Sequence, residues 1–205
     1  MEASVAEGIR WGALGPLLLL SAAVMGSPGP TTVSLVGVAA AFGWRSAVPY
    51  MIGEVVGTVL VLFAVAMGVT AMLLAVPALA SVLVVAASAY ILWLAFRIAT
   101  APPLSKADEA NTPSLGGGLL LGVANPKAWV AIAAVFTSVR IAEAVTIDAA
   151  IKVIVLTVMI VVIHVVWLMA GAALASLLRH RRASRVVNVS MAVSLVTATV
   201  LALLR

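Results

Sequence analysis

Two apolar stretches of the 205-residue chain are interrupted by residues that break helices. The first interruption is Pro28-Gly29-Pro30 and the second is Asn125-Pro126-Lys127. Because proline removes a helical hydrogen bond and clashes with the preceding turn, each stretch is expected to kink or to divide into two half-helices. Each break would free backbone groups that can bind a polar ligand.

The residues that follow the first break could bind an anion. We expect the N–H groups of Thr31, Thr32 and Val33 to lack helical acceptors, and the start of a helix carries a partial positive charge. Such an end can hold a carboxylate. The side chains of Thr31, Thr32 and Asn125 could bind a substrate or could only satisfy freed backbone groups, and the sequence leaves both interpretations open.

Three ionisable residues, Glu54, Lys127 and His164, lie inside apolar stretches. A charged side chain at the centre of a membrane costs about 2.5–3.5 kcal/mol on insertion scales, so each one needs a partner or a function. Glu54 lies between Gly53 and Gly57, where a neighbouring helix can approach closely. It could bind a substrate ammonium or exchange a proton, because burial favours the neutral acid that a proton carrier requires.

Structural roles are the alternatives for the same residues. Glu54 could form a salt bridge with Lys127, and Lys127 could bind a substrate carboxylate or only neutralise Glu54. A backbone carbonyl is expected to satisfy the ring of His164. Two nearby tryptophans, Trp129 and Trp167, lie deep enough in their stretches to face a cavity.

The composition places these residues in a membrane. Hydrophobic residues make up 64% of the chain, charged residues make up 9%, and the mean hydropathy is +1.25, which is far from the balance of a soluble domain. The absence of cysteine excludes disulfides and thiolate metal sites, and isolated His, Asp and Glu residues predict neither a metal site nor a cofactor. The net charge of +5 falls in short segments between apolar runs, which indicates topology rather than nucleic-acid binding.

We predict an all-α integral membrane protein with six transmembrane helices, because lipid offers backbone groups no partners outside a helix. A single transmembrane domain is expected over residues 1–205, with halves at about 1–100 and 118–205 and a linker at about 101–117. The expected spans are about 13–41, 47–75, 78–100, 117–139, 149–178 and 186–204. The two breaks then fall in the first helix of each half, and such a matched pair indicates the binding site of a transporter rather than two ordinary kinks.

The distribution of lysine and arginine predicts the orientation. The loops after the first, third and fifth spans carry Arg45, Arg97, Lys106, Arg179, Arg181, Arg182 and Arg185. The opposite side holds both termini, fewer basic residues, and the acidic residues Glu2, Glu7, Glu143 and Asp148. The positive-inside rule therefore places the first set in the cytoplasm and both termini on the periplasmic or extracellular side. Two three-helix halves that enter from opposite sides have the geometry of an inverted repeat.

Four motifs carry a resemblance to a known family. They are Ser27-Pro28-Gly29-Pro30, Gly43-Trp44-Arg45, Ala89-Tyr90-Ile91-Leu92-Trp93-Leu94-Ala95 and Asn125-Pro126-Lys127-Ala128. With these motifs the chain resembles, over nearly its whole length, the lysine exporter and homoserine/threonine resistance (LysE/RhtB) family of amino-acid exporters. The specific feature is the proline-glycine motif followed some 95 residues later by Asn-Pro-Lys.

The resemblance implies export of amino acids or close derivatives across the inner, cytoplasmic membrane, driven by the proton-motive force. The candidate substrate-binding residues are Pro28, Gly29, Pro30, Thr31, Thr32, Glu54, Asn125, Pro126 and Lys127. We expect the carboxylate at Thr31-Thr32, with Asn125 or Lys127, and the ammonium at Glu54, which would also carry the coupling proton. The expected partners are the amino acid, protons and membrane lipids; a homodimer is compatible with the sequence, which shows no interface.

The substrate stays open at this point, because the acidic residue at position 54 resembles the lysine-exporting branch and the short linker resembles the threonine and leucine branch. A membrane-embedded enzyme is a weaker alternative, since the spans contain no Gly-x-Ser-x-Gly turn and no aspartate pair. An exporter of another small solute, or a passive channel, is the other alternative. Flux through a channel would not respond to a pH gradient.

Overall fold

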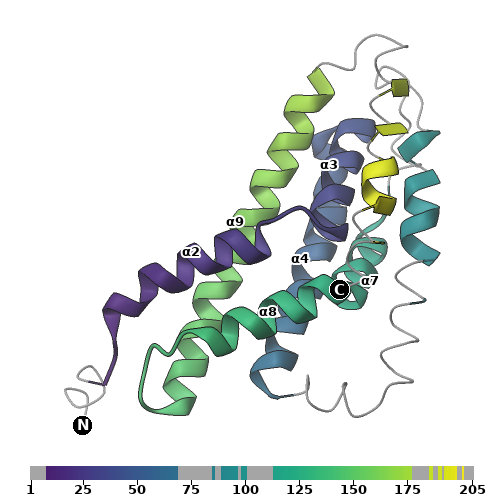
Figure 1. The fold of residues 1–205 in the computed structure, drawn as a ribbon. Helices are drawn as coiled ribbons and strands as arrows, with labels where there is room; N and C mark the ends of the chain where they lie inside the picture. Colours follow the sequence, from purple (N-terminus) through teal and green to yellow (C-terminus); the bar gives the residue numbers. More distant parts are fainter. Residues whose placement is uncertain are drawn as a thin grey trace.

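A computed structural model describes residues 8–68, 85, 89–96, 98–100, 113–176, 185–186, 189–190, 192–197 and 200. Every named regular element in this part of the chain is a helix (Figure 1). These elements are η1 (Trp11–Ala13), α2 (Leu14–Met25), α3 (Pro30–Phe42), α4 (Trp44–Ala66), α7 (Leu115–Ala124), α8 (Pro126–Ser138) and α9 (Val145–Ser176). The predicted all-α class is confirmed for the described residues.

Both predicted helix breaks are present. The chain bends by 65° between Trp11–Met25 and Pro30–Phe42, and by 56° between Leu115–Ala124 and Pro126–Ser138. Pro30 and Pro126 stand at the start of α3 and α8, where a missing N–H breaks no helical bond. Proline therefore ends one half-helix and begins the next at each break.

The described helices give two to four membrane spans. Helices α4 and α9 are each long and apolar enough to cross a membrane, and each bent pair would count as one further span. About half of the predicted third span, about half of the sixth span and most of the linker lie outside the described residues. The six-helix count and the inverted repeat therefore stay predictions.

The second span differs from its predicted bounds. Helix α4 begins at Trp44, directly after Gly43 with φ of 88°, and it ends at Ala66 rather than at residue 75. Two residues after that end, Gly68 has φ of 77°, and its N–H donates to the Val65 carbonyl. A left-handed glycine at this position is a common way to end a helix, and the apolar run gave no sign of it.

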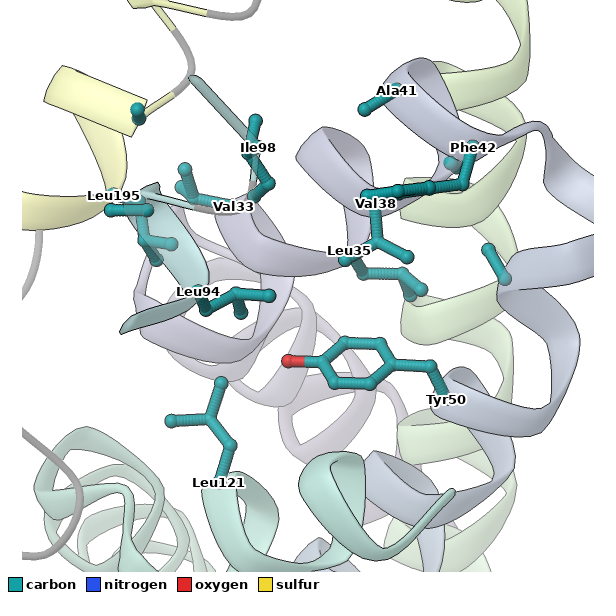
Figure 2. Packing of buried hydrophobic residues seen from close by; sticks show 14 of the residues in the cluster. Val33, Leu35, Val38, Ala41, Phe42, Tyr50, Leu94, Ile98, Leu121 and Leu195 are labelled. Carbon is teal, nitrogen blue, oxygen red and sulfur yellow. The ribbon is translucent and has the colours of Figure 1, made fainter. Parts of the chain in front are cut away.

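Two clusters of buried apolar residues lie at different levels of the bundle. Figure 2 shows the first, in which the ring of Tyr50 lies among Leu35, Leu94 and Leu121. The second cluster is built from α2, the last turns of α4, α8 and the first half of α9, with the buried members Leu17, Val61, Leu62, Val65, Ala128, Ile132, Val135, Ile141, Leu156 and Ile160. At least one polar residue lies between the members of the two clusters in each bent helix pair, in α4 and in α9.

Glycines allow α4 and α7 to approach closely. Gly53 and Gly57 of α4 face α7, and a Cβ added at Gly57 would lie 2.6 Å from the Leu119 carbonyl oxygen. From the other side, a Cβ at Gly122 would lie 2.6 Å from the carbonyl oxygen of Glu54. The prediction that the glycines beside the acidic residue admit a neighbouring helix is confirmed.

Gly122→Ala is expected to lower stability, because the added methyl group meets backbone atoms that cannot move independently. Overpacking of this kind costs about 1–3 kcal/mol. Gly116→Ala in the same helix is the control, since its Cβ would meet no atom closer than Ser114 Oγ at 3.8 Å. Unfolding by denaturant in detergent micelles should separate the two variants, and equal stability would contradict the close contact.

Candidate functional site

The two helix breaks contact each other directly. The Lys127 ammonium donates to the carbonyl oxygen of Ser27 and, at 3.3 Å, to that of Pro28. The Asn125 amide Nδ2 donates to Thr31 Oγ1 at 3.3 Å. Residues nearly one hundred positions apart in sequence are therefore brought together at one site.

Thr32 caps the first break. The Gly29 N–H donates to Thr32 Oγ1 at 2.8 Å, and the same hydroxyl lies 3.1 Å from the Gly29 carbonyl oxygen. The Val33 N–H donates to the Gly29 carbonyl at 2.9 Å. The expectation that Val33 has no acceptor was wrong, because the carbonyl of the residue before the helix closes its first regular turn.

The second break has a matching cap. Asn125 Oδ1 accepts from the Lys127 N–H at 3.1 Å, so this side chain starts α8 as well as bonding to Thr31. Gly29 leaves room opposite for the Lys127 side chain, which would have to shift if a Cβ were added 2.5 Å from its Cδ atom. Asn125 and Thr32 thus perform the structural role that the sequence left open, and both also line the cavity described below.

Two tryptophan indoles donate hydrogen bonds to backbone carbonyls that precede the breaks in sequence. Trp167 Nε1 donates to the Gly26 carbonyl at 3.1 Å, and Trp129 Nε1 donates to the Val123 carbonyl at 2.8 Å. These carbonyls belong to the last turns of α2 and α7, which have lost their helical donors. Neither indole lines the cavity, so the expectation that both face it was wrong.

Glu54 of α4 lies against α3 and is fully buried. Its Oε1 is hydrogen bonded to the Ser34 hydroxyl at 2.7 Å, and the same hydroxyl lies 2.7 Å from the Thr31 carbonyl oxygen. The Tyr50 hydroxyl, one turn before Glu54 in α4, is buried without a hydrogen bond to any described residue. Glu54 is therefore joined to the first turn of α3 through a single hydroxyl group.

The proposed salt bridge between Glu54 and Lys127 is not formed. The ion pairs among the described residues are Arg10 with Glu143 and Lys152 with Asp148. Lys127 instead reaches across to the carbonyls of the first break, which attract its ammonium without a charge partner. Glu54 is thus a buried carboxyl with a hydroxyl partner and no cation beside it.

A small cavity lies where the breaks meet. Its lining consists of Met25, Thr31, Thr32, Thr58, Asn125, Lys127, Ala128, Ala131, Ile132, Ile160, Ile163 and His164. It has room for about two water molecules. Four predicted residues, Thr31, Thr32, Asn125 and Lys127, line it, whereas Glu54 and the prolines do not.

Two further polar residues enter the cavity, and a third connects it to Glu54. Thr58 and His164 are buried lining residues, and Ser34 makes the connection. A helical spacing could have pointed to two of them: Thr58 stands four residues after Glu54, and Ser34 stands three residues after Thr31, so each pair shares a helix face. No comparable pattern marks His164.

The cavity favours negative charge. The first turns of α3 and α8 both contribute lining residues, and both helices present a partial positive end there. Lys127 adds an ammonium, and no carboxylate lines the cavity among the described residues. In the same ranges of the chain, no group of three His, Cys, Asp or Glu side chains is placed to hold a metal ion.

The apolar helices and the two bent helix pairs are those of a multi-pass membrane protein, and a small cavity lies where the two breaks meet. The sequence profile described as LysE type translocator matches residues 22–204. The chain therefore belongs to the LysE type translocator family, and the resemblance noted in the sequence is confirmed. This is a family of membrane transporters and not a family of enzymes. No curated protein and no solved structure matches the chain.

Asn125→Ala should destabilise the protein by about 0.5–2 kcal/mol, because it removes the cap of α8. Asn125→Ser keeps a hydroxyl acceptor for the Lys127 N–H but loses the amide that donates to Thr31. Equilibrium unfolding in micelles should therefore place the serine variant closer to the unaltered protein than the alanine variant. Equal losses for both would show that the bond to Thr31, and not the cap, supplies the stability.

Proposed function

We propose that the protein exports amino acids or close derivatives across the inner membrane in exchange for protons. The observation that carries the proposal is the meeting of two helix breaks at one cavity lined in part by polar side chains, with a buried carboxyl joined to that cavity by a hydroxyl group. Matched breaks of this kind are the usual position of a transporter's binding site. Membership of a translocator family supports transport as the activity.

The substrate carboxylate would bind between the two helix starts. The first turn of α3 contributes Thr31 and Thr32, and the first turn of α8 contributes Lys127. In the described conformation Lys127 donates to backbone carbonyls of the first break. A carboxylate is a stronger partner for an ammonium than a carbonyl oxygen, so substrate binding would draw Lys127 away from those carbonyls.

Glu54 would carry the coupling proton. The Ser34 hydroxyl has one proton and two acceptors at 2.7 Å, the Thr31 carbonyl and the Glu54 carboxyl. When Glu54 is ionised, Ser34 donates to the carboxylate; when Glu54 is protonated, the acid can donate to Ser34, which then donates to Thr31. The protonation state of Glu54 thereby changes the hydrogen bonding of the first turn of α3, where the carboxylate would sit.

Alternating access would require the bundle to open. The cavity holds only about two water molecules, and an apolar cluster lies at each side of it along the helices. The two halves also pack differently. Helix α4 of the first half contacts mainly α7, the part before the second break, whereas α9 of the second half contacts mainly α3, the part after the first break. If the halves are inverted repeats, exchanging these two arrangements would open the site to the other side.

Glu54→Gln should abolish the response to a pH gradient. The purified protein is placed in liposomes and tested with a panel of labelled amino acids. An imposed pH gradient should drive selective transport, and a protonophore should stop it. The variant holds a permanently neutral side chain, so exchange of one amino acid for another should persist while the gradient has no effect. Glu143→Gln is the control, because that carboxylate is exposed.

A gradient response that survives Glu54→Gln would leave Glu54 with a structural role only. Flux of amino acids that is indifferent to the gradient in the unaltered protein would favour a channel. Failure of every amino acid in the panel, with another small solute transported, would move the substrate to a different chemical class.

We further propose that both termini lie outside and that the Arg45 side faces the cytoplasm. The chain has no cysteine, so single cysteines can be introduced without a background. Ser46→Cys, beside Arg45, should resist a membrane-impermeant thiol reagent in intact cells, and Ala144→Cys, at the α8–α9 connection, should react. The reverse pattern would invert the proposed orientation.

A further inference from the structure

The ring of His164 has a defined proton on one nitrogen. Nδ1 lies 2.7 Å from the carbonyl oxygen of Ile160, one turn earlier in α9. A carbonyl oxygen only accepts, so Nδ1 must carry the proton and donate. In the neutral ring Nε2 is then a hydrogen-bond acceptor.

That acceptor has no partner within the described part of the chain. His164 is 3% exposed, and its Nε2 atom is buried without a hydrogen bond. Thr58 Oγ1 is also buried without a hydrogen bond to a described residue, and both residues line the cavity. Buried polar groups are nearly always paired in folded proteins, so these two groups are available at one cavity to bond to water or to a ligand that replaces it.

The cavity therefore contains polar groups of two kinds. Positive groups come from the starts of α3 and α8 and from Lys127, whereas His164 and Thr58 offer acceptors from α9 and α4. Met25, Ala131 and Ile163 are among the apolar residues that complete the lining. An α-amino acid has the matching arrangement, with a carboxylate and an ammonium on one carbon.

We propose that His164 and Thr58 form the ammonium subsite, in which His164 Nε2 and Thr58 Oγ1 accept hydrogen bonds from the α-ammonium of a substrate with an uncharged side chain. This assignment rests on the proposed function and moves the ammonium from Glu54, which does not line the cavity. Glu54 is then free to act on the proton alone.

The lining also sets the class of side chain. A second ammonium or a guanidinium would need a carboxylate, and none lines the cavity among the described residues. A carboxylate side chain would enter an apolar wall formed by residues such as Ala131, Ile132 and Ile160. Small apolar or hydroxyl-bearing side chains fit this environment at the lowest cost.

Nitrogen NMR of the purified protein, labelled at its two histidines, tests the subsite without relying on transport. The His164→Gln variant identifies the His164 signals. Without ligand, the spectrum should show a protonated Nδ1 and a bare Nε2. Alanine, leucine, threonine and a short alkylamine should shift the Nε2 signal, whereas propionate, which has a carboxylate but no amine, should leave it in place.

The outcomes separate this assignment from the proposed function. Amino acids that bind while the Nε2 signal stays fixed would overturn the subsite and leave amino-acid transport standing. An alkylamine that shifts Nε2 while no amino acid binds would support the subsite and count against amino-acid transport. A protonated Nε2 in the ligand-free protein would also overturn the subsite.

Affinity measurements supply a second test. His164→Phe keeps a ring of similar size but removes the acceptor, so affinity for alanine should fall about tenfold to a hundredfold, the range for a hydrogen bond to a charged group. His164→Gln should restore part of the loss through its amide oxygen. Affinity for propionate should be the same in all three proteins, and an equal loss for both ligands would overturn the assignment.

Discussion

A proline break in the middle of a membrane helix leaves backbone groups that lipid cannot satisfy, and the whole site follows from this constraint. The carbonyls before the first break accept from Lys127 and Trp167, which belong to the other half of the sequence. The second break is capped by Asn125, whose amide also reaches Thr31. Side chains of the second half therefore complete the first break, whereas the second break is capped from within its own half.

This arrangement makes the same groups available for a ligand. Bonds from Lys127 and Asn125 to the first break are made by polar side chains that line the cavity, so in the proposed mechanism a substrate takes over these donors in exchange for their present acceptors. A regular helix would offer no such exchange, because its bonds are internal. Two apolar clusters lie along the helices on either side of these bonds.

The close packing of α4 on α7 positions the acidic residue. Glycines on both helices bring their backbones together, and Glu54 projects from this contact toward Ser34 rather than into the cavity. A larger residue at the contact would separate the helices and move Glu54 relative to α3. Ser34 thus joins Glu54 to the first turn of α3, which lines the cavity, and the proposed mechanism uses this link between the proton and the substrate.

Local chemistry alone determined a large part of this protein. Composition required a membrane, proline fixed where two helices divide, and an acidic residue between glycines marked a buried, closely packed helix. The tertiary structure decided the rest: Lys127 bonds to carbonyls rather than to Glu54, Thr58 and His164 enter the cavity, and Glu54 lies outside it. The breaks depend on bonds within a few residues, whereas the partners depend on how whole helices rotate and tilt when their side chains pack.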